Sequence, residues 1–284
     1  MELKFVDLYQ YFGVEKPEAG DGTLQCFIQK TDVHICQKRV RPGMLILPGG
    51  GYCHVSPRES EPVALHLLTR GYCVFVLRYG VLPARFPTAL REAAMAMRYI
   101  RENAAELQVD PGMVAAMGFS AGGHLCGTLG TMYDCPEVAD IGPAELLRPD
   151  ALGLCYPVAV SWGPTHAGSF DALCGDDTAL RQRLSLDRLV RPDMPPVFIW
   201  HTRDDDCVPC RNSLLLAQAA QEAGVDLALH IYRHGPHGLS TADVQSYPTS
   251  LLPKTSTDVP CWIETMMDFL AELGFTVRDE GVWA

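Results

Sequence analysis

The chain has 284 residues, of which 48% are hydrophobic, and a net charge of −11. This length allows a large buried core, and α/β folds of this size often form one domain. The charge and the lack of a Lys/Arg cluster argue against nucleic acid and anionic membranes as partners, because phosphate binding needs a positive surface. The acidity by itself indicates only solubility.

The N-terminal residues 1–7 lack the basic stretch and apolar stretch of a secretory signal. No apolar run approaches the length of a membrane span. The eleven cysteines are an odd number and lie in and beside apolar segments. In a chain without a leader they are expected to be reduced and mostly buried. We therefore expect a cytoplasmic protein.

Apolar runs at residues 24–28 and 33–36 predict a strand pair with a turn between them, in an N-terminal part of about residues 23–40. The core is expected at about residues 41–273. No repeat, low-complexity tract or linker divides the sequence, so we predict that residues 1–284 form a single domain.

Short apolar runs and amphipathic segments alternate through this core. The predicted strands lie at residues 43–47, 72–77, 113–117, 151–156, 197–201 and 227–232. The predicted helices lie at residues 61–68, 90–107, 212–223 and 260–273, with a further helix from Ser120 to about residue 131. Continuous apolar strands alternating with helices predict an α/β fold with a mostly parallel, doubly wound sheet and helices on both faces.

Ser120 is the centre of a Gly-x-Ser-x-Gly pentapeptide that directly follows the predicted strand at residues 113–117. A strand that enters a helix through so tight a turn strains its central residue and lifts that side chain clear of the sheet. The flanking glycines let neighbouring backbone approach without a Cβ clash. Ser120 is therefore a candidate nucleophile, although the pentapeptide alone also occurs by chance.

An activated serine needs a histidine base whose tautomer is fixed by a carboxylate. His237 lies in a loop broken by glycine and proline after the last predicted strand, where catalytic loops of an open α/β sheet gather. An ordinary surface histidine is the alternative. The acid is expected just past the preceding strand, at Asp204, Asp205 or Asp206, although aspartate runs are also common in turns.

Three glycines at residues 49–51 follow the predicted strand at residues 43–47. A flexible turn is one interpretation. The other is an oxyanion loop, whose backbone N–H groups stabilise the negative charge that develops during acyl transfer. On that interpretation the predicted donors are the amides of Gly50, Gly51 and Ala121.

These motifs together resemble the α/β-hydrolase esterases, in particular the carbohydrate-esterase-like group that includes acetyl xylan and feruloyl esterases. The matching stretches are residues 47–52, 77–80, 109–111, 118–125, 148–151, 195–201 and 234–238. They cover roughly residues 40–240. The order serine, aspartate, histidine along the chain is also the order of this family.

The resemblance implies an α/β-hydrolase fold and a role for particular residues. Such hydrolases often carry His-Gly-x-x-Asp-x-x-Val-Pro around the acid, and this pattern laid on residues 201–209 selects Asp205. Thr202 replaces the glycine of the pattern without moving the aspartate. Pro48 replaces the histidine of the lipase/esterase His-Gly-Gly-Gly loop, which leaves the glycine amides available.

The resemblance further implies a serine esterase that needs no metal or organic cofactor. Its expected substrate is a small-molecule ester, an acetylated sugar or xylo-oligosaccharide. The sequence has no long lid insertion, which also favours a small acyl group. Tyr52, after the glycine loop, and Trp162, in the stretch at residues 157–175, are the predicted substrate contacts.

Cys207 and Cys210 form a Cys-x-x-Cys beside the proposed acid. A redox site of the thioredoxin type needs a different βαβ context, and a zinc site needs two more ligands.

His124 and His201 are expected to be structural. The sequence leaves open the natural ester and any role of Cys207 and Cys210. It also leaves open the oligomeric state, which includes the case of a homo-oligomer.

Two alternative functions remain at this stage. A serine peptidase of the prolyl-oligopeptidase type uses the same triad order, but its relatives carry a large propeller domain. A non-catalytic binding protein on this fold is the other alternative, because a fold does not fix a function.

Overall fold

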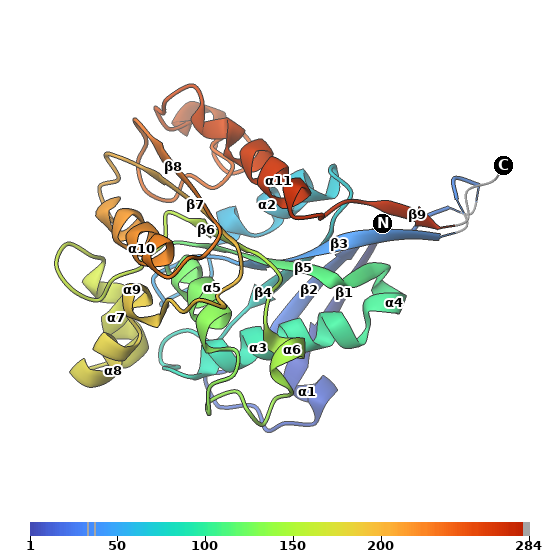
Figure 1. Ribbon diagram of the computed structural model, residues 1–284, viewed down its shortest axis with the longest axis horizontal. Helices are drawn as coiled ribbons and strands as arrows, with labels where there is room; N and C mark the ends of the chain where they lie inside the picture. Colours follow the sequence, from blue (N-terminus) through green and yellow to red (C-terminus); the bar gives the residue numbers. More distant parts are fainter. Residues whose placement is uncertain (33, 37, 281–284) are drawn as a thin grey trace.

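The computed structural model describes residues 1–32, 34–36 and 38–280, which form a central sheet with helices on both faces (Figure 1). The strands are β1 (Glu2–Asp7), β2 (Thr23–Ile28), β3 (Lys38–Leu47), β4 (Cys73–Arg78), β5 (Val109–Phe119), β6 (Leu152–Cys155), β7 (Val197–Thr202), β8 (Leu227–Tyr232) and β9 (Arg278–Glu280). The α-helices are α1 (Leu8–Phe12), α2 (Glu61–Leu68), α3 (Thr88–Glu102), α4 (Ala104–Leu107), α5 (Ala121–Met132), α6 (Ala144–Leu147), α7 (Ala167–Cys174), α8 (Thr178–Arg183), α9 (Leu186–Leu189), α10 (Arg211–Glu222) and α11 (Trp262–Glu272). The short 3₁₀ helices are η1 (Pro57–Glu59), η2 (Thr249–Leu251) and η3 (Val259–Cys261).

The described residues form one nine-stranded sheet in the order β1-β2-β4-β3-β5-β6-β7-β8, with β9 paired to β3. The run from β4 to β8 is parallel throughout. β1, β2 and β9 pair antiparallel with their neighbours. Parallel neighbours require crossover connections, which the helices supply. This topology confirms the predicted mostly parallel, doubly wound α/β sheet.

Alternate residues of the central strands enter two separate cores, one on each face of the sheet. Leu45 of β3 belongs to the core that contains Leu90 of α3 and Leu125 of α5. Its neighbour Ile46 belongs to the opposite core, with Trp262 of α11. Successive side chains of a strand point to opposite faces, so a strand covered on both sides is apolar at every position. This explains the continuous apolar runs in the sequence.

The N-terminal part differs from the predicted strand pair. Residues 34–36 form a turn, in which the Asp32 carboxylate accepts the N–H of His34 at 2.8 Å, and Val33 lies outside the described residues. Such a side chain–backbone bond competes with strand pairing. The partner of β2 is instead β1, an edge strand whose exposed Leu3 and Phe5 leave little periodic signal.

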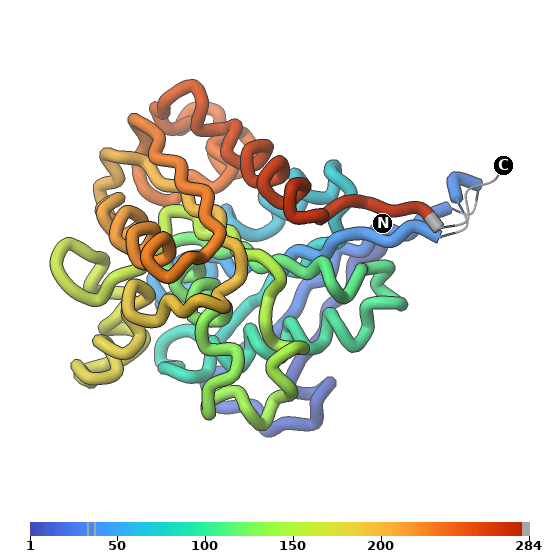
Figure 2. Tube along the Cα trace, in the orientation of Figure 1, coloured from blue at the N-terminus to red at the C-terminus, as the bar shows by residue number. Residues whose placement is uncertain are grey.

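Both ends of the described chain join the sheet. The C-terminal strand β9 pairs antiparallel with the start of β3, and Figure 2 shows this red segment running back beside the blue one. We propose a single domain on this basis. The predicted helix at residues 90–107 is divided into α3 and α4 at Asn103. In the part of the chain that the structure describes, no helix has the length and hydrophobicity needed to cross a membrane.

The strand order reverses at β3, because β4 lies on one side of it and β5 on the other. The loops after two neighbouring parallel strands leave a crevice at such a point, at their carboxyl ends. The glycine loop at residues 49–51 follows β3, and Ser120 follows β5. The topology therefore brings these two motifs to the same crevice.

Close backbone contacts fix the turn around Ser120. A Cβ atom on Gly118 would lie 2.1 Å from the carbonyl oxygen of Gly122. A Cβ atom on Gly122 would lie 2.1 Å from the carbonyl oxygen of Leu47 in β3. Only glycine fits at either position, so β5, α5 and β3 meet here without side chains between them.

We predict that Gly122→Ala lowers the free energy of unfolding by about 2 kcal/mol or more, because the backbone itself must move to admit the methyl group. Gly168→Ala in α7 is the matched control, since its added Cβ would meet nothing closer than 3.5 Å. The control should retain wild-type stability in urea unfolding. Equal stability of Gly122→Ala and the control would contradict the prediction.

Glu92 of α3 is a buried carboxylate that joins α3 to two loops. It accepts hydrogen bonds from the Tyr9 hydroxyl and the Asp21 N–H, each at 2.9 Å, and from the N–H of Gly80. Burial raises the pKa of Glu92 to about 7, although these donors act in the opposite direction. A pKa above the unfolded value of about 4.3 means that protonation favours the folded state.

The stabilising contribution from protonation of Glu92 should therefore be complete below pH about 4 and lost as the pH rises through about 7. We predict that the difference in unfolding free energy between the wild type and Glu92→Gln increases when the pH is lowered from 7 to 5. Urea unfolding at a series of pH values measures this difference. A difference that stays constant or shrinks would show that Glu92 is ionised in the folded protein throughout this range.

Candidate active site

Ser120, His237 and Asp205 form a continuous chain of hydrogen bonds. The Ser120 Oγ lies 2.8 Å from His237 Nε2, and Asp205 Oδ2 lies 2.7 Å from His237 Nδ1. With the ring proton on Nδ1, the serine hydroxyl donates to Nε2 and Nδ1–H donates to the carboxylate. A histidine held in this way can remove the serine proton.

The backbone of Ser120 has the strain that the sequence predicts, with φ 53° and ψ −117°. This φ is unfavourable for a residue with a side chain and persists only where the surroundings enforce it. The N–H of Ser120 donates to the carbonyl of Cys155, and its carbonyl accepts from Val158 and His124, at 3.0–3.1 Å. These bonds hold the turn from several directions.

Asp205 is buried beneath His237. Its Oδ1 accepts the N–H groups of Cys207 and Val208 at 2.9 and 2.8 Å, and its Oδ2 also lies 3.1 Å from His201 Nε2. Burial acts to raise the pKa of Asp205, but the hydrogen bonds from His201 and His237 outweigh it and hold that pKa well below its usual range. The carboxylate is therefore ionised at neutral pH and can stabilise a protonated His237.

The three adjacent aspartates have different partners. Asp204 accepts from His234 Nδ1 and from the N–H of Gly235, each at 2.8 Å. Asp206 accepts the backbone N–H of His237 at 3.3 Å. Of the three, Asp205 is the one bonded to the His237 ring. The geometry supports its selection as the acid.

We predict that Asp205→Asn lowers kcat for an aryl acetate about 10³–10⁴-fold, because the amide no longer favours the required tautomer of His237. Asp204→Asn and Asp206→Asn should each keep kcat within about 10-fold of the wild type, since neither side chain reaches the ring. Steady-state kinetics of the three variants measures this. A larger loss in Asp204→Asn or Asp206→Asn than in Asp205→Asn would refute the assignment.

The glycine loop lies against Ser120. A Cβ atom on Gly49 would lie 3.0 Å from Ser120 Cβ. Gly50 and Gly51 have φ values of 125° and 65°, which glycine adopts without a steric cost. Within the described ranges, the N–H groups of Gly50, Gly51 and Ala121 donate to no protein atom. Ala121 begins α5, whose first N–H groups have no partner within the helix.

Tyr52 supports this loop from inside the protein. It is 3% exposed, and its hydroxyl lies 2.8 Å from His124 Nδ1. His124 Nε2 donates to the carbonyl of Leu184 at 2.8 Å, so Nδ1 accepts from the tyrosine. Burial lowers the pKa of His124 to about 4, so the ring is neutral. The predicted substrate contact of Tyr52 conflicts with this burial, whereas the structural role predicted for His124 is confirmed.

Trp162 lies in the loop between β6 and α7 and is 41% exposed, with its Nε1 donating to Asp187 at 2.9 Å. Its substrate contact stays a prediction. The sequence did not single out His166 of the same loop, whose Cε1 lies 3.7 Å from the position of a Cβ atom on Gly51. His166 Nδ1 lies 2.8 Å from Ser169 Oγ, which fixes the ring beside the glycine loop.

Asn212, at the start of α10, joins this loop to the loop of the acid. A polar residue near a helix start was its only signal in the sequence. Its Oδ1 accepts the N–H groups of Ala159 and Val160 at 3.1 Å. Its Nδ2 donates to the carbonyls of Pro164 and Pro209. The side chain is fully buried, so these bonds replace the hydration that it loses.

His201 has the structural role that the sequence predicts. It is fully buried, and its Nε2 lies 2.8 Å from the carbonyl oxygen of Val208 as well as near Asp205. Its Nδ1 lies 2.8 Å from the hydroxyl oxygen of Ser213. Because Nε2 must donate to the carbonyl, Nδ1 accepts from the serine. His201 thus lies near the same carboxylate oxygen, Oδ2, as His237 and helps to orient the acid.

Cys207 and Cys210 are free thiols beside the acid. Burial raises the pKa of both, and the negative charge of Asp205 acts in the same direction. A raised pKa lowers the thiolate fraction, which works against a thiol–disulfide role. In the described ranges, no group of three His, Cys, Asp or Glu side chains is placed to hold a metal ion.

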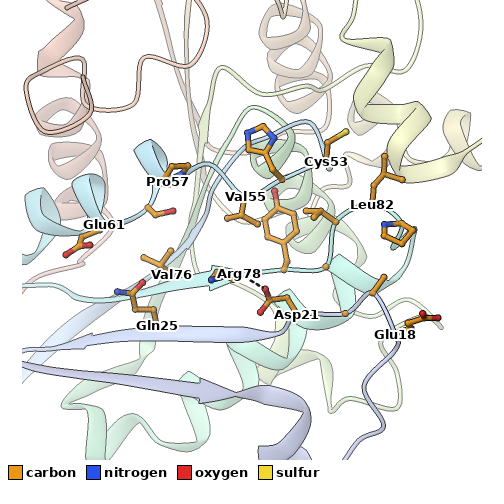
Figure 3. Close-up of a pocket in the computed structure, with 18 residues that line it drawn as sticks. Glu18, Asp21, Gln25, Cys53, Val55, Pro57, Glu61, Val76, Arg78 and Leu82 are labelled. Carbon is orange, nitrogen blue, oxygen red and sulfur yellow. Dashed lines mark ion pairs between the residues drawn. The ribbon is translucent and has the colours of Figure 1, made fainter. Parts of the chain in front are cut away.

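A cleft of about 790 Å³ lies beside the glycine loop (Figure 3). Cys53 and His54, which come after Tyr52 at the end of that loop, line one part of the cleft, and Gln25 and Arg78 line another. Arg78 pairs with Asp21 at 3.2 Å. Amide, guanidinium and carboxylate groups in one cleft provide both donors and acceptors for a polar ligand.

Three comparisons with known proteins show what this chain is similar to. The BD-FAE family model matches residues 32–142. The crystal structure of an acetyl ester-xyloside bifunctional hydrolase from Caldicellulosiruptor lactoaceticus is 37% identical, covers 89% of both chains and superposes with a TM-score of 0.78. The chain belongs to the carbohydrate-esterase-like group of the α/β-hydrolase family. This membership confirms the resemblance in the sequence and the predicted α/β-hydrolase fold.

Two curated relatives of this chain are longer proteins. Endo-1,4-beta-xylanase B from Butyrivibrio fibrisolvens is 37% identical over 72% of this chain and 33% of its own length. An acetylxylan esterase from Xylanibacter ruminicola is 29% identical over 78% of this chain and 45% of its own length. The chain thus spans less than half the length of either relative.

Proposed function

We propose that the protein is a serine esterase that hydrolyses small acyl esters, most simply acetyl esters, on sugars or xylo-oligosaccharides. The observation that carries the proposal is the hydrogen-bonded chain from Ser120 through His237 to Asp205. It lies next to the glycine loop, in which the N–H groups of Gly50 and Gly51 donate to no described protein atom. This arrangement combines a nucleophile, a base, an orienting acid and donors for an oxyanion.

In the first half of the proposed reaction, His237 Nε2 takes the proton of Ser120 as Oγ attacks the ester carbonyl carbon. Asp205 stabilises the imidazolium that forms, and the amides of Gly50, Gly51 and Ala121 bind the oxyanion. The tetrahedral intermediate collapses when the bond to the alcohol breaks. His237 gives its proton to that leaving oxygen, and the acyl group stays on Ser120.

The second half repeats these steps with water. The water oxygen attacks the acyl carbon while His237 takes a proton from that water, and the same amides bind the second oxyanion. Cleavage of the bond to Ser120 Oγ returns the proton from His237 to the serine. The carboxylic acid leaves, and every proton taken by His237 is given back within the cycle.

The carbohydrate part of the proposal is supported by the relatives. Two of the matched proteins are described as acting on an acetyl ester or acetylxylan. The cleft that begins at Cys53 has polar side chains such as Gln25 and Arg78, and none of Ser120, Asp205 and His237 lines it. Sugar hydroxyls both donate and accept hydrogen bonds, so such a cleft suits an alcohol of this class.

We predict that a fluorophosphonate probe labels the wild type once, at Ser120, and does not label Ser120→Ala. Intact mass and peptide mapping measure the label. Ser250→Ala is a control, because Ser250 is an exposed serine in η2, and this variant should still label. Unlabelled wild type, or equal labelling of Ser120→Ala, would favour a non-catalytic binding protein instead.

We further predict that acetyl aryl esters are hydrolysed with a higher kcat/KM than butyryl and octanoyl ones, and that acetate is released from acetylated xylo-oligosaccharides. Aminoacyl anilides serve as the comparison for a peptidase of the prolyl-oligopeptidase type. Preference for anilides would overturn the esterase proposal, and preference for octanoyl esters would overturn the small-acyl part alone.

A further inference from the structure

A buried carboxylate outside the triad joins the glycine loop to the loop of His237. Glu59, in the 3₁₀ helix η1, is 3% exposed. Its Oε2 accepts the N–H of Gly49 at 2.8 Å, and its Oε1 accepts the hydroxyl of Tyr156 at 2.7 Å. A carboxylate is costly to bury unless its oxygens are hydrogen-bonded, and both oxygens of Glu59 are.

Tyr156 extends this connection to the histidine. Its hydroxyl accepts the N–H of Ser240 at 2.8 Å, three residues after His237 in the same loop. Its ring also packs edge-to-face against the His237 ring, with centroids 5.1 Å apart. Tyr156 is 2% exposed and has a φ of 38°, so the residue is held in a strained position directly beside the base.

The peptide unit between Pro48 and Gly49 is fixed at both of its polar ends. The Tyr79 hydroxyl donates to the carbonyl of Pro48 at 2.6 Å, and the N–H of Gly49 donates to Glu59. A Cβ atom on Gly49 would lie 2.7 Å from Glu59 Oε2, so the carboxylate is in direct contact with the loop. The next two residues are the proposed oxyanion donors Gly50 and Gly51.

The hydrogen-bonding pattern requires an acid at position 59. Gly49 N–H and Tyr156 O–H are both donors, so the side chain between them must accept twice. A glutamine has one accepting oxygen, and its NH₂ group only donates. With glutamine, either the amide of Gly49 or the hydroxyl proton of Tyr156 would be left without a partner in a buried site.

We propose that Glu59 is a positioning residue of the esterase reaction, acting through Gly49 on the oxyanion amides and through Tyr156 on the loop of His237. The inference rests on the proposed function. The hydrogen bonds of Glu59 go to Gly49 and Tyr156 and not to the triad side chains. It orients the Pro48–Gly49 peptide, and the amides of Gly50 and Gly51 follow that orientation.

The test compares Glu59→Gln and Tyr156→Phe with matched controls on exposed positions, Glu272→Gln and Tyr11→Phe. Two quantities are measured for each: kcat and KM for an aryl acetate, and the inhibition constant of a small alkyl boronic acid. The boronic acid forms a tetrahedral adduct with the serine, so its affinity reports how well the oxyanion amides are placed.

Glu59→Gln should lower kcat about 10–100-fold and leave KM within about 3-fold of the wild-type value. The inhibition constant of the boronic acid should rise by a factor similar to the loss in kcat. Tyr156→Phe should show the same pattern to a smaller extent, and the controls should match the wild type. A merely structural role would lower the fraction of active protein and leave the boronic acid inhibition constant unchanged.

Wild-type kcat and boronic acid affinity in a folded Glu59→Gln protein would overturn the inference. If Glu59→Gln does not fold, the Tyr156→Phe variant tests the inference instead, because this change removes only one hydroxyl. An unchanged boronic acid inhibition constant in Tyr156→Phe would equally overturn the inference. A wild type that hydrolyses no ester and takes no fluorophosphonate label would instead overturn the proposed function, so the two failures are distinguishable.

Discussion

The backbone contact between β5, α5 and β3 is the constraint on which the rest of the site depends. Gly118 and Gly122 bring strand and helix so close that no Cβ atom fits, and Gly122 also meets the carbonyl of Leu47. This contact holds Ser120 in its strained conformation and sets the glycine loop beside it. The strained Ser120 and the glycine amides that are its proposed oxyanion donors are thus placed by packing of the main chain.

Buried polar groups then fix the loops around this rigid centre. Asp205 is held by two backbone amides and His201, while Asn212 ties the acid loop to the neighbouring loop. Glu59 and Tyr156 connect the glycine loop with the loop of His237. Because each group lies in the interior, leaving one of its partners unpaired costs more than a surface hydrogen bond would. Such networks suit a site that must stay in one geometry.

Much of the fold and of the candidate site could be predicted from the sequence, because their signals are local. Strands covered on both faces give continuous apolar runs, and the turn at Ser120 needs glycines at fixed spacing. The edge strand β1 and the turn after Asp32 were missed, since exposed apolar residues and a side chain–backbone bond mask the strand pattern. The burial of Tyr52, and the bond between Glu59 and Tyr156 across 97 residues, follow from tertiary packing that no local pattern encodes.

The central claim is that Ser120 is the nucleophile and that Gly50, Gly51 and Ala121 bind the oxyanion. The most direct measurement is a crystal structure of the protein with a small alkyl boronic acid. The account predicts boron bonded to Ser120 Oγ, with one boronate oxygen within hydrogen-bonding distance of these amides. A boronate bonded to another residue, or one whose oxygens point away from the glycine loop, would contradict it.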